Sequence, residues 1–220
     1  MELLQKKKAT VNSPDNDGMT ALHLPCAGGH DSTARLLIEN FEADKKGETN
    51  DGATTLHLVC ASHHDSTAWL LIKEFEADKN DTTNDRATPL HLACAGGHHS
   101  TLQLLIDQFA ADKNGKTNDR ARALHLACAG GHDSTAQHLI EKFAAGKNDT
   151  TNAGATVTPL HLACAGGHDS TIKLLIKNYG ADMKAKDRAG RTALHMLLIK
   201  LFFFVLLCFE SVIAIPLHAA

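Results

Sequence analysis

The chain has 220 residues, of which 22 are lysine or arginine and 25 are aspartate or glutamate, so its formal net charge at pH 7 is −3. This charge gives no electrostatic reason to expect nucleic acid as a partner, and the length allows one or two ordinary domains. The six cysteines follow an opening segment, MELLQKKKAT, that does not read as a secretory signal. We therefore expect free thiols in a reducing, cytoplasmic compartment.

One short motif recurs along the chain and predicts its organisation. It reads LHLPCAGGHDST from Leu22 and LHLACAGGHDST from both Leu124 and Leu160. The histidine after the first leucine recurs at spacings of 34, 34, 34, 36 and 34 residues, at His23, His57, His91, His125, His161 and His195. The spacing of 36 indicates a two-residue insertion around residues 153–157. A fixed period of this length predicts a stack of repeated structural units.

The 34-residue period divides the whole chain into units, starting with a partial unit at the first residue. The segment from Leu3 aligns without gaps onto the segment from Leu175, so we expect residues 1–16 to form the second helix and loop of a partial unit. The remaining boundaries follow from the same register. Complete units are expected at residues 17–50, 51–84, 85–118, 119–154 and 155–188, then the start of a partial unit at 189–196 and a hydrophobic tail at 197–220.

Local chemistry predicts helix, tight turn, helix and polar loop within each unit. Thr158 is a hydroxyl N-cap, and Pro159 suits the first helical position because its missing N–H is not needed there. The glycine pair ending at Gly167 suits a left-handed turn that closes this short helix. A second helix, apolar on one side, is expected from about Asp169 to Gly180.

Helix pairs this short cannot bury their own apolar faces, so the units are expected to stack. The segment from Thr158 to His195 resembles the ankyrin repeat in its T-P-L-H start, its G-H turn, its leucine pair and its G-A-D and D-x-x-G-x-T loop. The resemblance covers roughly Leu3 to His195. It implies an all-α solenoid of stacked helix-turn-helix units with hairpin-like loops.

The cluster His161, Cys164 and His168 could be a metal site, a thiol–imidazole pair or neither. The resemblance implies that His161 bonds backbone groups at the start of the first helix, and that Cys164 fills a position usually held by alanine, where cysteine packs as a small apolar residue. A structural zinc site needs four converging ligands, which this pattern does not supply. We therefore expect no metal, no cofactor and no catalytic residue.

The resemblance also implies that a partner protein is bound by the loops and by the exposed side of the first helices. Those helix positions hold only alanine, glycine and serine, so recognition is expected to depend on the loop tips. Each tip residue could instead be a solvated turn residue. The candidate partner-binding residues are Met19, Arg86, Arg120, Arg122, Arg188 and Arg191.

Two irregular positions lie on the helices. Pro25 falls inside the first helix of its unit, where proline costs about 3 kcal/mol, so the first complete unit is expected to be the weakest. Trp69 aligns with Arg35, Gln103 and Gln137, and it either packs on a neighbour or contacts a partner.

The tail from Met196 to Pro216 carries only two charged residues, Lys200 and Glu210. Its length is close to that needed to cross a membrane, although a charge near the middle of a span costs about 2.5–3.5 kcal/mol. A terminal repeat would instead need a polar outer face. Three interpretations stay open: a membrane segment at residues 197–216, a terminal helix that is buried or covered by a partner, and an aberrant chain end.

These features together predict a non-catalytic scaffold that binds a partner protein, and not nucleic acid, through its repeat loops and concave face. The chain is expected to be a cytoplasmic monomer. The alternative is an adaptor of the same kind that its hydrophobic C-terminal segment anchors to a membrane.

Overall fold

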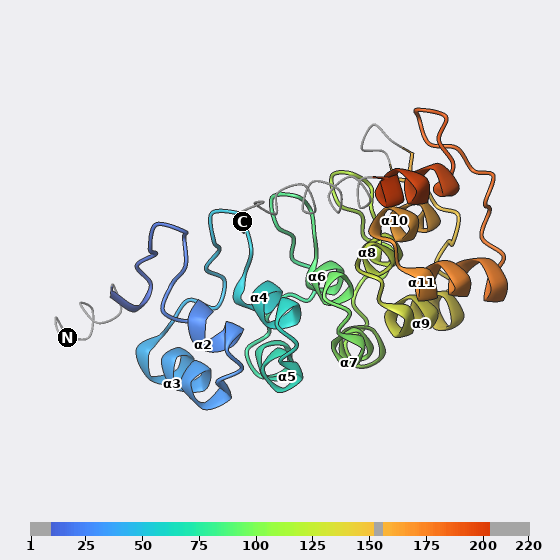
Figure 1. The fold of residues 1–220 in the computed structure, drawn as a ribbon. Helices are drawn as coiled ribbons and strands as arrows, with labels where there is room; N and C mark the ends of the chain where they lie inside the picture. The colour runs from blue at the N-terminus through green and yellow to red at the C-terminus, as the bar shows by residue number, and fades with distance from the viewer. Residues whose placement is uncertain (1–9, 152–155, 203–220) are drawn as a thin grey trace, which may run out of the picture.

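A computed structural model describes residues 10–151 and 156–202, which form a stack of short antiparallel helix pairs with loops along one side (Figure 1). The first helices of the pairs are α2 (His23–Ala27), α4 (Thr55–Ala61), α6 (Pro89–Ala95), α8 (Ala123–Gly130) and α10 (Pro159–Gly166). The second helices are α3 (Asp31–Phe41), α5 (Asp65–Lys73), α7 (His99–Gln103), α9 (Asp133–Phe143) and α11 (Asp169–Lys173). Two second helices end in π-helical turns, η1 (Leu104–Gln108) and η2 (Leu174–Asn178). The predicted all-α solenoid is confirmed.

Helices α4, α6 and α10 begin with a threonine and a histidine that cap one another. The Thr88 N–H donates to His91 Nδ1 at 3.2 Å, and Thr88 Oγ1 accepts from the His91 N–H at 3.4 Å. The opposite ring nitrogen of His57 reaches the following loop, where Nε2 donates to the Ala87 carbonyl at 3.1 Å, and His125 and His161 make the same kind of bond. Nε2 of His23 and of His91 has no hydrogen-bond partner among the described residues. The predicted role of this histidine, bonding backbone groups and tying loop to helix, is confirmed.

The turn between the two helices of a pair needs a left-handed backbone and close approach by the next unit. Gly131 has φ 74°, and a Cβ there would lie 2.5 Å from His168 Nδ1. His168 Nε2 in turn donates to the Ala129 carbonyl at 2.8 Å, and His132 makes the same bond to the Ala95 carbonyl. Glycine therefore makes room for a histidine that ties each unit to the one before it.

The core is built from small and medium apolar residues shared between neighbouring units. Cys60, Cys94 and Cys128 are fully buried among leucine and alanine side chains, and they are free thiols. Burial raises the pKa of Cys128 to about 12 and that of Cys164 to about 11. These thiols stay protonated at neutral pH and act as apolar packing residues.

Threonine–aspartate hydrogen bonds connect the second helices of neighbouring units, except between α7 and α9. Thr101 Oγ1 donates to Asp65 Oδ1 at 2.5 Å, and Thr171 makes the same bond to Asp133. At the intervening junction, His99 replaces the aspartate, and the buried Thr135 Oγ1 has no hydrogen-bond partner. The junction between α7 and α9 therefore lacks one polar contact that its neighbours have.

The first complete pair is distorted at Pro25. Helix α2 has five residues and begins at His23, whereas α4 has seven and begins at Thr55, two positions earlier in its unit. Pro25 is the third residue of α2, and it has no N–H to donate to the Ala21 carbonyl. The predicted position of Pro25 inside the first helix is confirmed.

The last described helix, residues 193–202, runs through the position at which other first helices turn. Lys200 and Leu201 stand where α10 has its glycine pair, and the Lys200 ammonium donates to the Gly166 carbonyl. Leu198, Leu201 and Phe202 are exposed. Within residues 10–151 and 156–202, no helix has the length and apolar character needed to span a membrane. Residues 203–220, most of the predicted tail, lie outside the described residues, as do residues 1–9.

Replacing Pro25→Ala should lengthen α2 and raise the free energy of unfolding by up to about 3 kcal/mol. Hydrogen exchange should slow mainly within residues 20–45, because stacked units couple only to their neighbours. Exchange in α8 and α9 serves as the internal control and should not change. Unaltered exchange across residues 20–45 would contradict this explanation of the short helix.

Stability should fall in mild acid because of the buried histidines. Burial lowers the pKa of the four first-helix histidines His23, His57, His91 and His125 below the ordinary value of 6.5. The unfolded chain therefore binds protons at these sites before the folded chain does. The free energy of unfolding should be at its maximum above about pH 6.5 and decrease below it, each histidine contributing at most about 1.4 kcal/mol per pH unit.

Urea unfolding between about pH 8 and about pH 5 measures this dependence. A His57→Asn variant should be less stable at the upper end and should lose less stability across the same range, because one proton-binding site is gone. A wild-type free energy of unfolding that stays constant over the range would contradict the prediction.

Candidate binding surface

The loop tips are held in register by asparagine side chains. Asn84 Nδ2 donates to the Asn50 carbonyl, and Asn118 Nδ2 donates to the Asn84 carbonyl, each at 3.0 Å. The Asn118 N–H also donates to the Asp85 carbonyl at 2.8 Å. Paired bonds of this kind fix each tip to the one before it, so side chains on neighbouring tips are presented at a fixed spacing.

Two of these tips place arginine where other units use glycine. Arg86 and Arg120 have φ values of 59° and 57°, and the equivalent positions elsewhere are Gly18, Gly52 and Gly190, with φ between 75° and 81°, and Thr156, with φ 43°. A left-handed backbone costs a residue other than glycine about 1–2 kcal/mol. Both arginines are exposed, and neither forms an ion pair with any described residue. Backbone strain combined with an unpaired exposed charge suggests a functional position.

The remaining predicted tip residues lie in different settings. Arg188 is exposed, whereas Met19 is half-buried and its N–H donates to Asp15 Oδ1 at 2.8 Å. Arg191 Nε donates to Asp187 Oδ2 at 2.8 Å, and the Asp187 side chain is fully buried. Arg191 therefore has a structural role within its own loop, through its ion pair with Asp187, in addition to its predicted role in binding.

Apart from Leu24 of α2, which is 68% exposed, the exposed side of the first helices carries small side chains, as the sequence indicates. The exposed residues there include Ala61, Ser62, Ala95, Gly96, Ala129 and Gly130. A partner that reaches these helices would meet mostly backbone and methyl groups.

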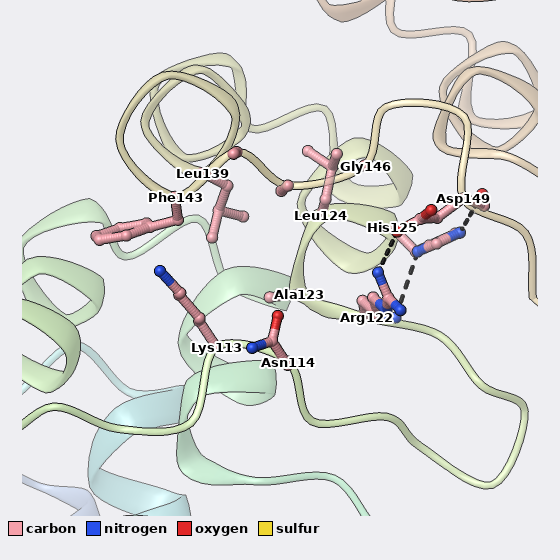
Figure 2. Close-up of a pocket in the computed structure, with 12 residues that line it drawn as sticks. Lys113, Asn114, Arg122, Ala123, Leu124, His125, Leu139, Phe143, Gly146 and Asp149 are labelled. Atoms are coloured by element: carbon pink, nitrogen blue, oxygen red, sulfur yellow. Dashed lines mark hydrogen bonds and ion pairs between the residues drawn. The ribbon is translucent and has the colours of Figure 1, made fainter.

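A small pocket lies in the unit of residues 119–154, where α9 ends and its loop begins (Figure 2). Its volume is about 50 Å³, far smaller than an ordinary ligand site. Figure 2 shows Lys113 and Phe143 on one side of it, and Arg122 with Asp149 on the other. The Lys113 ammonium lies 5.1 Å from the centroid of the Phe143 ring, a cation–π contact.

The Arg122 side of the pocket is held by a connected set of bonds. The Arg122 guanidinium pairs with the Asp149 carboxylate, and both side chains are about one-third exposed. The Arg122 N–H donates to His125 Nδ1 at 3.3 Å, and His125 Nε2 donates to the Asp149 carbonyl at 3.0 Å. Burial lowers the pKa of His125, so the ring is neutral at pH 7. Arg122 thus takes the N-cap position that threonine holds in α4, α6 and α10.

The cluster His161, Cys164 and His168 is not assembled into one site. His161 Nε2 donates forward to the Arg191 carbonyl at 3.1 Å, and His168 Nε2 donates backward to the Ala129 carbonyl at 2.8 Å. Cys164 is buried between them. The two rings therefore serve opposite neighbours, and in the described part of the chain no three His, Cys, Asp or Glu side chains are grouped so that they could hold a metal ion.

Trp69 lies on the outer side of the second helices and is 40% exposed. It lines a shallow groove between α3 and α5 together with Arg35 and Glu74, whose side chains form an ion pair at 2.6 Å. The tryptophan both packs beside its neighbour helix and remains partly accessible.

Sequence reasoning did not identify the pocket, although a signal for it exists. The predicted contact residues include Arg122, as one of several loop arginines. They do not include the other polar or loop residues of the pocket, Lys113, Asn114, Gly146 and Asp149. Comparing the units position by position would have shown that Gly146 replaces the aspartate of Asp44, Asp78, Asp112 and Asp182.

Comparison with known proteins is consistent with this architecture. A family model described as ankyrin repeats in three copies matches residues 1–83, 56–152 and 124–200, which together span residues 1–200. No curated protein matches the chain.

Proposed function

Because the chain belongs to the ankyrin repeat family, whose repeats generally mediate protein–protein interactions, we propose that it is a non-catalytic scaffold that binds a partner protein through its loop tips and concave face. In this proposal the chain acts as a cytoplasmic monomer without cofactor, and its complete units are those at residues 17–50, 51–84, 85–118, 119–154 and 155–188. The partner contacts are made by Met19, Arg86, Arg120, Arg122, Arg188 and Arg191.

The observation that carries the proposal is the pair of strained arginines at neighbouring tips. Arg86 and Arg120 keep left-handed backbones at exposed positions where glycine would fit without strain. Neither forms an ion pair with a described residue that would explain the cost. Arginine is among the residues most enriched at binding hot spots, and the asparagine bonds between tips present both guanidinium groups in fixed register.

The double variant Arg86→Gly with Arg120→Gly should lose partner binding without losing fold. Its free energy of unfolding should rise by about 0.5–1 kcal/mol per site, because glycine relieves the left-handed backbone while making the unfolded chain more flexible. Partner contact can be measured in cells by a photo-cross-linking residue placed at position 188. The cross-linked product should disappear in the double variant.

The matched control places the same cross-linker at Gln103 or Gln137, on the outer side of the second helices. It should give no product that depends on the two arginines. Equal cross-linking by the wild type and the double variant, with both folded, would contradict the assignment of the tips.

A second proposal, an adaptor tethered to a membrane through residues 197–216, is favoured by the exposed apolar side chains near the C-terminal end of the described chain. Leu194, Leu198, Leu201 and Phe202 are each more than half exposed. A terminal repeat that faces water would carry polar residues there. In the tethered form, the repeats still bind protein and the C-terminal segment sets the location.

Carbonate extraction of membranes tests the tether, with the full chain compared with a chain ending at His195. A full-length chain that pellets and floats on a density gradient, beside a truncated chain that is extracted, is the expected result. A full-length chain that is wholly extracted would contradict it. The flotation step separates membrane association from aggregation through the apolar patch.

A further inference from the structure

The unit of residues 119–154 departs from the other units at two positions, and both departures line the same pocket. Arg122 replaces the threonine found at Thr54, Thr88 and Thr158. Gly146 replaces an aspartate whose carboxylate normally accepts from a backbone N–H two residues later, as Asp112 does from Asn114 at 2.9 Å. Both substituted positions line the pocket in Figure 2, and the Asp149 carboxylate lies where a side chain at Gly146 would begin.

The unit also lacks a hydrogen bond that, in other units, joins an asparagine side chain to the backbone N–H of the next unit's loop at the equivalent of the pocket. Asn80 Oδ1 accepts from the Asp112 N–H at 2.8 Å, and Asn148 Oδ1 accepts from the Asp182 N–H at 2.9 Å. The equivalent pair here, Asn114 and Gly146, makes no such bond. Asn114 and Gly146 both line the pocket, and neither the Asn114 side-chain amide nor the Gly146 N–H has a hydrogen-bond partner among the described residues.

The charged groups that line the pocket leave one positive charge in excess. Lys113 and Arg122 contribute two positive charges and Asp149 contributes one negative charge, while His125 is a neutral ring whose nitrogens are both bonded. Arg122 has five N–H donors, of which the Asp149 carboxylate engages one. Figure 2 shows the Lys113 ammonium beside the Phe143 ring and the Arg122 guanidinium beside Asp149, on opposite sides of the pocket.

We propose that this pocket, bounded by Lys113, Asn114, Arg122 and Gly146, receives the side-chain carboxylate of an aspartate or glutamate from an extended segment of the partner protein. The inference rests on the proposed scaffold function and names the partner chemistry at one of its six contact residues. The N–H groups of Arg122 that Asp149 does not engage supply a charge-assisted bond to the carboxylate, and the exposed Lys113 side chain turns away from Phe143 to supply a second. The Gly146 N–H and the Asn114 amide supply neutral bonds.

Size and charge favour a carboxylate over larger or more highly charged anions. A volume of about 50 Å³ admits the end of one side chain. The Asp149 carboxylate at the pocket wall repels a phosphate dianion more strongly than a carboxylate, and an excess of one positive charge matches one carboxylate. The apolar floor formed by Leu124 and Leu139 accommodates the methylene groups of the incoming side chain.

The residues at the equivalent positions of other units give substitutions that should close the pocket and keep the fold. Gly146→Asp restores the aspartate of four other units and places a negative charge in the pocket, where only the flexible Asp149 side chain has to move. Arg122→Thr restores the threonine N-cap. Lys116→Thr, at an exposed residue outside the pocket, removes one positive charge and is the matched control for the overall charge.

The experiment selects random displayed peptides of about twelve residues on the full-length chain and measures the affinities of synthetic copies. Selected peptides should share an acidic residue, and changing it to its amide should weaken binding by about tenfold or more. Gly146→Asp and Arg122→Thr should each cause a similar loss, while Lys116→Thr should not. Thermal unfolding of each variant confirms that it is folded, and a phosphoserine in place of the acidic residue should bind more weakly than the carboxylate.

The outcomes separate this inference from the scaffold proposal. Peptides that lose affinity with Arg86→Gly and Arg120→Gly but bind both pocket variants normally would overturn the pocket and leave the scaffold proposal standing. Tighter binding of the phosphoserine peptides would overturn the carboxylate assignment. Failure to select any peptide above background would overturn the pocket as a peptide site.

Discussion

The structure depends on one constraint: a pair of short helices exposes an apolar face that only the next pair can cover. The first helices meet through alanine, valine, cysteine and leucine side chains, of which Val59, Cys60 and Ala93 are fully buried. Small residues let the helices approach closely, and free thiols fill the same space as alanine with slightly more volume. The other contacts of the stack are of two kinds: polar bonds that recur from unit to unit, and substitutions that occur in one or two units only.

Polar side chains fix the register that apolar packing alone would leave loose. Histidine links three first helices to the loop that follows, a second histidine links three turns to the helix before them, and asparagine links neighbouring loop tips. These bonds recur with the period of the sequence, so each unit is tied to both neighbours. The first-helix histidines accept a backbone N–H at Nδ1, which requires a neutral ring, and burial lowers the pKa of His23, His57, His91 and His125, so the architecture is sensitive to acid.

The proposed binding positions lie where a unit departs from this repeated pattern. Arg86 and Arg120 occupy glycine positions and carry backbone strain, while Arg122 and Gly146 remove a cap and a loop bond and open a charged pocket. A repeat that only had to stack would retain threonine, aspartate and glycine at these positions. The departures cluster in the units of residues 85–118 and 119–154, in the middle of the stack, where both neighbours hold them in place.

The sequence by itself determined the repeat period, the helix pairs, the capping residues and the all-α solenoid, because each depends on local chemistry repeated at a fixed spacing. It also identified Arg122, but as one loop arginine among several. Only the tertiary structure decided which residues of different units meet: that His161 and His168 bond opposite neighbours, that His99 leaves Thr135 without a partner, and that Arg122, Asn114 and Gly146 surround one pocket. Such contacts join residues about one repeat apart in the chain, and their geometry follows from the stacking of whole units, which local propensity does not encode.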